Sequence, residues 1–320
     1  MLLNLEYFNS VWVTSLTNQI LQPNAIALGN FDGLHQGHIE VLKPVIKTEK
    51  EKIYKTVVSF TPHPQEFFTG QQRKLLTPLA EKISYLEKLG LEQLILLPFD
   101  RELANLSPED FLKELLVKKL AVRFISVGED FRFGYQRSGD AKLLRAIAHT
   151  LGIEVEITNL KNQKDVRISS SEIRQALTLG EIEKANAMLG REYSILGKVI
   201  KGQQLGQKLG FPTANLEILP VKFLPKQGVY LVRVELINQP HSSHLGLMNI
   251  GYRPTVNGQN LTVETHLLDW SGDLYNQTLS VNLIKFLRPE QKFDSLEALK
   301  AQINADIQTA RKLNLTISHE

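Results

Sequence analysis

The sequence contains no cysteine, which excludes several kinds of chemistry. Without a thiol there is no disulfide, no thiolate nucleophile and no cysteine-based zinc site. No apolar run approaches the roughly 18 residues that a membrane-spanning helix needs. The first ten residues, MLLNLEYFNS, also lack the basic and long apolar regions of a signal peptide. We therefore expect a cytoplasmic protein that is neither exported nor inserted into a membrane.

An excess of one charge is also missing. The 320 residues carry 37 Lys and Arg against 34 Asp and Glu, a net charge of +3, without a polybasic run. Nucleic acid and membrane are therefore not expected as partners. The composition, 42% hydrophobic and 22% charged, is that of a globular protein, and the length suits two domains of roughly 100–200 residues each.

Residues 25–41, AIALGNFDGLHQGHIEV, organise the first half of the chain. An apolar strand leads into a glycine-rich turn, and a helical pattern begins near His35 and His38, with Pro44 expected to kink or shorten the helix. A helix start carries unpaired N–H groups and about half a positive charge, which suits phosphate, and two imidazoles one turn apart add hydrogen-bond donors. The alternative is a connection whose glycines serve only the backbone, but the preceding Gly-x-Phe-Asp-Gly makes it the weaker interpretation.

Short apolar runs alternate with helical patterns as far as residue 160. The strands are expected at residues 55–60, 93–97, 122–127 and 153–157, and the helices at 79–89, 108–120 and 140–150. This alternation predicts a Rossmann-like α/β domain, a parallel sheet with helices on both faces. Ligands of such sheets bind beyond the carboxyl ends of the strands, where His35 and His38 would lie.

Three further segments of this half combine residues that suit a nucleotide site. Residues 59–64, SFTPHP, form a stiff loop that either lines the site or only connects two elements. Residues 128–134, GEDFRFG, can stack a planar ring, or can be a loop packed by two phenylalanines. Residues 167–174, RISSSEIR, open a helix, where a serine can bind an anion or simply cap the helix.

From Tyr193 onward the pattern changes to short strands with Gly and Asn turns. They are expected at residues 194–201, 229–236, 245–250, 262–268 and 279–286, followed by an amphipathic helix at 295–313. These strands predict a closed antiparallel, Greek-key-like β-barrel with a C-terminal helix. We place the domain boundary between residues 186 and 187, giving domains 1–186 and 187–320.

The barrel half contains a second group of polar residues. Residues 201–216 include glycines that allow close approach to phosphates, and Thr213 and Asn215 offer hard oxygen ligands of the kind that Mg²⁺ accepts. Glu264, on a strand, could take a proton from an attacking alcohol. The alternatives are a hairpin loop that binds nothing and a glutamate that is solvated or paired with a neighbour.

The sequence GNFDGLHQGH resembles the signature of adenylyl-transferring nucleotidyltransferases, in the variant found in bacterial bifunctional riboflavin kinase/FAD synthetases. FTPHP, GEDFRFG and ISSSEIR are similar to further motifs of that family, and GFPTANL with VETHLLDWSGDLY resembles its riboflavin kinase module. The motifs occur in family order from about residue 25 to residue 311. Three positions depart from the pattern: Ser171 replaces a threonine, Asn276 a glycine and Gln207 a basic residue.

The resemblance implies a role for each motif residue. Catalytic roles are implied for His35, His38, Ser170, Arg174 and Glu264, and metal binding for Thr213 and Asn215. Nucleotide or phosphate contacts are implied for Gly29, Asn30, Phe31, Asp32, Gly33, Arg167, Ser169, Ser171, Gly202, Gly206 and Gly210. Flavin or adenine contacts are implied for Pro62, His63, Pro64, Asp130, Phe131, Arg132 and Phe133.

The implied function is a bifunctional enzyme of FAD biosynthesis. The barrel would phosphorylate riboflavin to FMN with ATP, and the N-terminal domain would adenylylate FMN to FAD with release of pyrophosphate, both with Mg²⁺. We expect small-molecule partners and a monomer or weak homo-oligomer. The alternatives are an adenylyltransferase for another phosphorylated vitamin or pantetheine phosphate, which the barrel disfavours, and a non-catalytic flavin-binding regulator.

Overall fold

The computed structural model describes residues 11–15, 17–49, 52–159, 162–163, 166–202, 206, 209–239, 243–255 and 258–317. By its internal contacts the chain divides into two compact units, Met1–Ser170 and Ser171–Glu320. Helix α7 (Ser170–Leu179) therefore begins at the division, and α8 (Ile182–Leu189) belongs to the second unit. The boundary between the two catalytic domains, placed after residue 186 from the sequence pattern, stays a prediction.

The first unit contains a six-stranded parallel sheet in the order β1-β4-β3-β2-β5-β8. In chain order its strands are β1 (Trp12–Thr14), β2 (Asn24–Leu28), β3 (Tyr54–Thr61), β4 (Gln93–Pro98), β5 (Val122–Gly128) and β8 (Glu154–Thr158). Its longer helices are α1 (Gln36–Ile46), α3 (Leu79–Lys88) and α6 (Ala141–Thr150). Shorter elements are η2 (Thr17–Gln19), α2 (Pro64–Thr69), α4 (Arg101–Ala104), α5 (Pro108–Asp110), β6 (Arg132–Phe133), η4 (Tyr135–Arg137), β7 (Gly139–Asp140), β9 (Asn162–Gln163) and β10 (Val166–Arg167).

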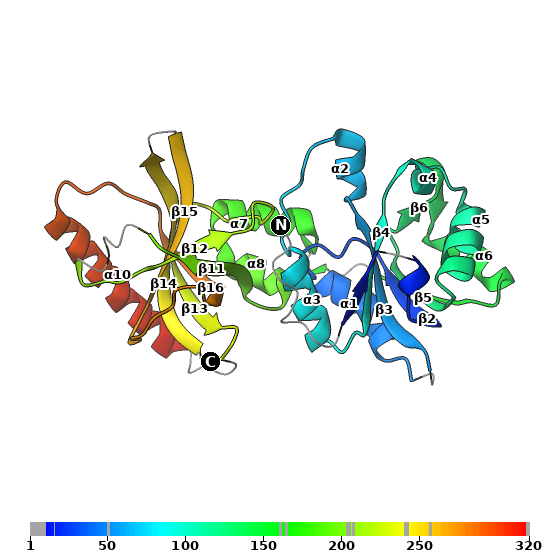
Figure 1. The fold of residues 1–320 in the computed structure, drawn as a ribbon, viewed down its shortest axis with the longest axis horizontal. Helices are drawn as coiled ribbons and strands as arrows, with labels where there is room; N and C mark the ends of the chain where they lie inside the picture. Colours follow the sequence, from blue (N-terminus) through cyan, green and yellow to red (C-terminus); the bar gives the residue numbers. More distant parts are fainter. Residues whose placement is uncertain are drawn as a thin grey trace. The chain divides into compact units, whose positions relative to one another are not determined.

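Alternate residues of the strands build two separate cores, because successive side chains of a strand point to opposite faces. Ala25 and Ala27 pack with residues of α1 and α3, whereas Ile26 and Leu28 pack with residues of α6 and of η3 (Phe111–Lys119). Figure 1 shows α1 and α3 on one side of the sheet and α5 and α6 on the other. The predicted α/β architecture is confirmed.

Two predicted helices differ in detail from the structure. The helix expected over 108–120 consists of α5 followed by η3, which is wound as a π-helix; Leu120 N–H accordingly bonds to the Leu115 carbonyl, five residues back. Helix α1 continues through Pro44 to Ile46. Ser107 is the N-cap of α5, since its Oγ accepts from the Asp110 N–H at 3.0 Å.

The second unit is a closed antiparallel barrel in the order β11-β12-β15-β14-β13-β16. Its strands are β11 (Tyr193–Ile200), β12 (Ala214–Ile218), β13 (Gly228–Leu236), β14 (Ser243–Thr255), β15 (Gly258–Leu267) and β16 (Thr278–Arg288). Buried and partly exposed residues alternate along β11, which is typical of a barrel wall. The predicted barrel is confirmed, and β12 is a strand that the sequence pattern missed.

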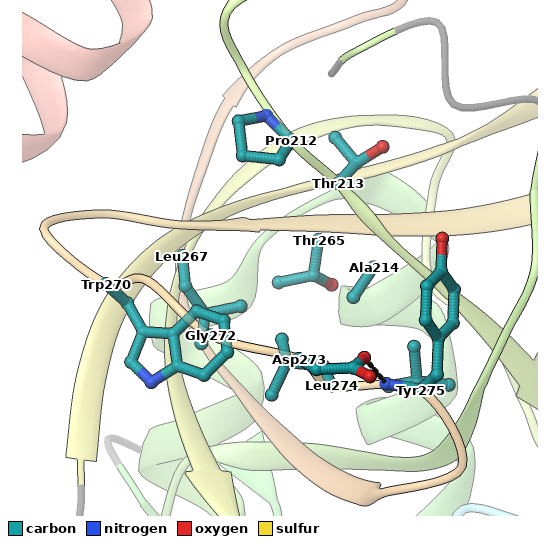
Figure 2. A pocket seen from close by; sticks show the side chains of 11 residues that line it. Pro212, Thr213, Ala214, Thr265, Leu267, Trp270, Gly272, Asp273, Leu274 and Tyr275 are labelled. Carbon is teal, nitrogen blue, oxygen red and sulfur yellow. Dashed lines mark hydrogen bonds between the residues drawn. The ribbon is translucent and has the colours of Figure 1, made fainter.

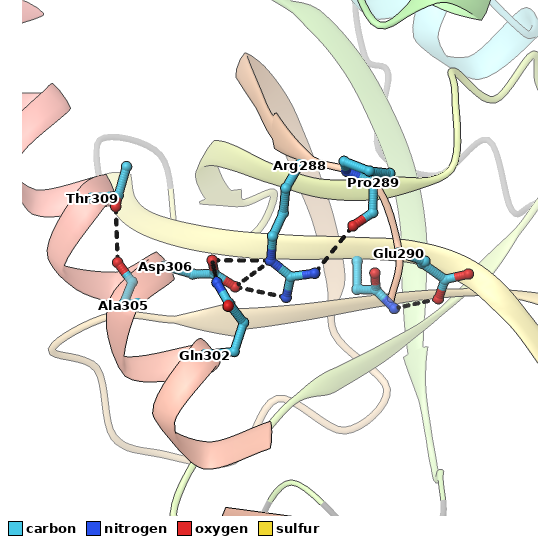
Figure 3. A network of polar contacts seen from close by, with 8 residues as sticks. Arg288, Pro289, Glu290, Gln302, Ala305, Asp306 and Thr309 are labelled. Atoms are coloured by element: carbon cyan, nitrogen blue, oxygen red, sulfur yellow. Dashed lines mark hydrogen bonds and ion pairs between the residues drawn. The ribbon is translucent and has the colours of Figure 1, made fainter. Parts of the chain in front are cut away.

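The C-terminal helix α10 (Leu296–Ile317) covers apolar residues of the barrel's outer surface, including Val229, Leu231 and Leu247. An ion pair fastens it there, as Figure 3 shows. Arg288 Nε donates to both Asp306 carboxylate oxygens at 3.1 Å, and Arg288 Nη2 donates to Oδ2 at 2.8 Å. Only 19% and 8% of the two side chains are exposed, so water screens the pair poorly.

Replacing Asp306 with alanine should destabilise the barrel, because it leaves the Arg288 charge buried without its partner. Removing one member of a buried pair typically costs about 3–5 kcal/mol. Thermal unfolding followed by circular dichroism should therefore show a lower midpoint for D306A. The matched control is Glu183→Ala, which breaks the exposed Lys285–Glu183 pair of the same unit and should leave the midpoint nearly unchanged. Equal midpoints for the two variants would contradict this role of Asp306.

Candidate active sites

The loop after β2 has an unusual backbone. Phe31 and Leu34 adopt φ values of +49° and +44°, and Gly33 lies at +91°. A left-handed conformation is costly for residues with side chains, about 1–3 kcal/mol each, and persists only where the surroundings hold it. Phe31 and Leu34 are both buried, so apolar packing holds the loop in this shape. Such strain is concentrated at functional sites, which agrees with the phosphate-loop prediction.

His35 and His38 lie together at the start of α1. His35 is the N-cap residue, and its Nδ1 accepts a hydrogen bond from the His38 backbone N–H at 3.2 Å. The two rings are stacked with centroids 3.6 Å apart. Because Nδ1 of His35 is an acceptor, the neutral ring carries its proton on Nε2, where it can serve as a donor.

Gly37 is a residue of this motif to which the sequence reasoning gave no role. A Cβ atom at this position would lie 3.2 Å from the imidazole of His35, closer than nearly all real contacts, and 3.8 Å from the Ile168 carbonyl. The glycine therefore leaves room for the His35 ring to fold back over the first turn of the helix. The spacing His-x-Gly-His thus has a steric reason.

Distant segments brace the loop. The Gly33 N–H donates to Thr77 Oγ1 at 2.7 Å, and the Thr77 N–H donates to Asp32 Oδ1 at 3.1 Å. The Ser170 hydroxyl donates to the Asp32 carbonyl at 2.8 Å, which ties the first residue of α7 to the loop. Of the predicted residues, the structure thus brings Ser170 together with residues 29–33, and it adds Thr77, which the sequence reasoning missed.

Two more missed residues meet the carbonyl of Asn30. Lys82 Nζ donates to this oxygen at 2.9 Å, and Ser59 Oγ donates to it at 3.1 Å. Burial lowers the pKa of Lys82, and the nearby carboxylate of Asp32 raises it in part. Asp32 is itself only 6% exposed, so its carboxylate acts on this lysine from a largely buried position.

The loop after β3 begins a short helix. His63 is the N-cap of α2: its Nδ1 accepts from the Gln65 N–H at 3.1 Å, and its own N–H donates to Glu66 Oε2 at 3.0 Å. Pro64 is the first residue of that helix. This arrangement gives His63 a structural task, and its predicted contact with a flavin or adenine stays a prediction.

An aromatic cluster, which the sequence reasoning missed, occupies the carboxyl ends of β3 and β4 together with α2. The ring centroids of Phe60, Phe67 and Phe68 lie 5.8, 5.4 and 5.9 Å from the ring centroid of Phe99, and all three contacts are edge to face. Phe68 is 71% exposed. An exposed aromatic side chain at the ligand-binding edge of a parallel sheet offers a surface for a planar ring.

The two phenylalanines of the segment after β5 differ in burial. Phe133 is buried and contacts Phe111 at a centroid distance of 5.2 Å, whereas Phe131 is half-buried and stacks on Phe133 at 5.7 Å. Phe131 is therefore the ring with a face left for a ligand. Asp130 and Arg132 are exposed. Asp140 caps α6, and the hydrogen bond from the Leu143 N–H is the main cause that lowers the pKa of this carboxyl, with a smaller contribution from Arg132.

The predicted site residues between 167 and 174 are described only in part. The Arg167 backbone belongs to β10, and its side chain lies outside the described residues. Ser169 is half-buried and Ser171 is exposed in the first turn of α7. The guanidinium carbon of Arg174, further along α7, lies 5.8 Å from the ring centroid of Phe223 in the second unit.

In the barrel, strand register brings the predicted metal and base residues together. Asn215 on β12 is directly opposite Glu264 on β15, and Asn249 on β14 is opposite Glu264 on its other side. The Thr213 hydroxyl donates to Glu264 Oε2 at 3.3 Å. Because directly opposed residues share one face of a sheet, Asn215, Asn249 and Glu264 project together. Asn249 was not predicted.

Two of the three predicted glycines pack on these residues. A Cβ at Gly202 would come within 2.2 Å of the Asn215 amide, and one at Gly206 would lie 2.4 Å from the Phe211 carbonyl and 3.3 Å from Thr213 Oγ1. Gly210 has a φ of +90°, which favours glycine. The neighbouring residues 203–205, 207 and 208, including the departure at Gln207, lie outside the described residues.

A cavity of about 170 Å³ opens beside Thr213. Figure 2 shows Trp270 and Tyr275 on two sides of it, with Thr265 between them. Thr265 is fully buried, and its Oγ1 has no hydrogen-bond partner among the residues that the structure describes. A buried hydroxyl without a partner is costly, so it suits a ligand that brings a polar atom into this cavity.

Comparison with known proteins agrees with this division into two sites. Residues 17–172 match the family described as FAD synthetase, and residues 189–314 match riboflavin kinase. A bifunctional riboflavin kinase/FMN adenylyltransferase of Escherichia coli (strain K12) is 41% identical, covering 90% of this chain and 91% of that protein. Its counterpart in Pseudomonas fluorescens is 40% identical, with 91% and 93% covered.

A crystal structure described as a macrolide-efflux protein from Streptococcus pneumoniae is also similar. Its TM-score is 0.83 at 28% identity, and the match covers 94% of this chain and 98% of that one. In the part of this chain that the structure describes, no helix is long and apolar enough to cross a membrane.

The fold and the two sites define a chain in which an FAD synthetase-type α/β unit precedes a riboflavin kinase-type barrel. The chain belongs to the family of bifunctional riboflavin kinase/FMN adenylyltransferases.

Proposed function

We infer that this protein makes FAD from riboflavin in two steps. The riboflavin kinase half transfers the γ-phosphoryl group of ATP to riboflavin, and the adenylyltransferase half joins the resulting FMN to the AMP part of ATP. The observation that carries this inference is the occurrence of both family domains, in order, across a chain that aligns with bifunctional relatives over 90% of its length.

For adenylyl transfer we propose that the strained loop and the start of α1 hold the triphosphate of ATP. An oxygen of the FMN phosphate attacks the α-phosphorus, the bond to the bridging oxygen breaks, and pyrophosphate leaves. His35 Nε2–H and His38 are proposed to donate hydrogen bonds to the phosphates. Ser170 is proposed to support the loop through its hydrogen bond to the Asp32 carbonyl, and Arg174 is proposed to add positive charge. Since no protein nucleophile is needed, positioning and electrostatic stabilisation supply the catalysis.

For the kinase step we propose that Glu264 accepts the proton of the riboflavin 5′-hydroxyl as its oxygen attacks the γ-phosphorus and ADP leaves. Its neighbour Thr213 already donates to the carboxylate, which fixes the orientation of the side chain. The cavity beside Thr213, with Trp270 and Tyr275 at its sides, is proposed to receive the planar base of ATP.

Mg²⁺ fits the residues of the kinase site. Among the described residues no three His, Asp or Glu side chains gather into a metal site of their own. Mg²⁺, however, typically takes only one or two protein ligands and completes its shell with water and substrate phosphates. Thr213 and Asn215 supply hard oxygens next to Glu264, so they are the residues proposed to hold it. When bound, it offsets the charge of the phosphates.

In the first unit, the aromatic cluster of residues 60, 67, 68 and 99 and the half-buried Phe131 are proposed to contact the flavin ring of FMN. Pro62, His63, Pro64, Asp130 and Arg132 are proposed to border the same region, because their loops follow β3 and β5 at the same edge of the sheet. The cytoplasmic location and the monomeric or weakly oligomeric state stay predictions.

The proposed function is tested by a chromatographic time course of the purified protein with ATP and Mg²⁺, started from riboflavin in one run and from FMN in another. FMN should rise and then give way to FAD in the first run, and FAD should form directly in the second. FMN without FAD in either run would mean that the α/β unit serves another substrate. No turnover at all would favour a non-catalytic flavin-binding protein.

A further inference from the structure

Lys82 has no role in the motifs of either active site, yet it reaches the loop that is proposed to hold phosphate. It lies on α3, 52 residues along the chain from Asn30, and its ammonium group donates to the Asn30 carbonyl at 2.9 Å. The side chain is half-buried rather than extended into water. Partly removing a lysine ammonium group from water costs free energy unless an opposite charge or a hydrogen bond compensates for the lost hydration.

The charge of Lys82 has a partner in Asp32. This carboxylate is 6% exposed and lies inside the loop that precedes the start of α1. A buried negative charge there would repel the phosphates of a nucleotide, and a cation beside it cancels that repulsion. The electrostatic interaction of Lys82 with Asp32 raises the pKa of the lysine, against the lowering by burial.

The hydrogen bond to Asn30 acts on the same loop in a second way. The Asn30 carbonyl accepts from both Lys82 on α3 and Ser59 on β3, and therefore points toward these two elements. The following residues have φ values of +49°, at Phe31, and +91°, at Gly33, which the chain keeps only where contacts enforce them. Fixing the carbonyl of Asn30 fixes the start of that strained segment.

We propose that Lys82 is a positioning residue for adenylyl transfer: it neutralises Asp32 and anchors the Asn30 carbonyl, so that the loop presents its backbone to phosphate. This proposal rests on the proposed function of the α/β unit. Lys82 acts through the loop, and Thr77 supports the same loop from the residue before the N-cap of α3.

The test compares Lys82→Met with the wild-type protein in FAD formation from FMN, ATP and Mg²⁺. K82M keeps an unbranched side chain that is one atom shorter, and it loses the charge and the hydrogen bond of the lysine. We expect kcat/KM to fall about 10- to 100-fold, the range that misplacing reacting groups can cost. FMN formation from riboflavin should not change, since Lys82 belongs to the first unit. Lys88→Met, at the exposed end of α3, is the matched control and should behave as wild type.

Two further variants separate positioning from a general loss of structure. Asp32→Asn in the K82M background removes the charge that Lys82 would neutralise and keeps an oxygen that can accept from the Thr77 N–H. The double variant should therefore be more active than K82M, and Lys82→Arg should retain most of the activity. A K82M enzyme within twofold of wild type, or a double variant no better than K82M, would overturn the proposal. If wild type itself makes no FAD, the proposed function fails instead.

Discussion

Replacing Glu264 with glutamine should stop the conversion of riboflavin to FMN while FAD formation from added FMN continues. Glutamine keeps the shape of the side chain and an oxygen that accepts from Thr213, but it cannot take the proton of the 5′-hydroxyl. General base catalysis typically contributes about 10²- to 10⁴-fold, so kcat for FMN formation should fall by that factor. Single-turnover assays with riboflavin and Mg·ATP measure it.

The matched control for this variant is Glu217→Gln. Glu217 lies on β12, the same strand as Asn215, but its side chain is exposed. E217Q should retain wild-type rates in both reactions, and the melting curve of E264Q should match that of wild type. An E264Q enzyme with unchanged kcat would show that the carboxylate is not the base, and Glu264 would then be a paired structural residue.

Replacing His38 with alanine should have the opposite selectivity. FAD formation from FMN should fall about 10²- to 10³-fold, the cost of removing one preorganised donor from a charged transition state. FMN formation from riboflavin should persist, because the barrel does not contain this residue. The two rates are read from the same chromatographic assay, started from FMN or from riboflavin.

Removing His38 also removes its ring contacts, so a structural effect must be separated from a catalytic one. His38 stacks on His35 and meets Phe31 edge to face at 5.3 Å. His38→Asn keeps a polar donor at smaller cost in packing and should recover part of the activity. His149→Ala, on the exposed end of α6, is the control and should leave both rates unchanged. An H38A enzyme that makes FAD at a near wild-type rate would remove His38 from the mechanism.

Much of the fold followed from hydrophobic periodicity. The strands expected at residues 55–60, 93–97 and 122–127 are β3, β4 and β5, each longer than expected by one or two residues, because buried strands have a strong apolar signal. Strand β12 was missed because its sequence, ANLEI, follows a Gly- and Pro-containing loop and has little β propensity. Its pairing with β11 and β15 makes it a strand, and that pairing is a property of the whole barrel.

The sequence motifs named candidate site residues, whose roles stay predictions, but they did not point to the residues that hold the loops in place. Thr77 and Lys82 come from a segment whose pattern is that of an ordinary amphipathic helix and its N-terminus. Nothing local marks them, since their partners Gly33 and Asn30 lie 44 and 52 residues earlier in the chain. Likewise, the sequence GEDFRFG does not show which of its two phenylalanines is buried, and only tertiary packing shows that Phe133 belongs to the core.

The protein is proposed to have two active sites that work independently within one chain. The most direct test mixes the H38A and E264Q variants and supplies riboflavin, ATP and Mg²⁺. Each variant alone should fail to make FAD from riboflavin, H38A stopping at FMN, whereas the mixture should make FAD because each variant supplies the step that the other lacks. Two results together would contradict the presence of two independent sites: riboflavin stays unconverted in the mixture, and one of the two variants is inactive in both half-reactions.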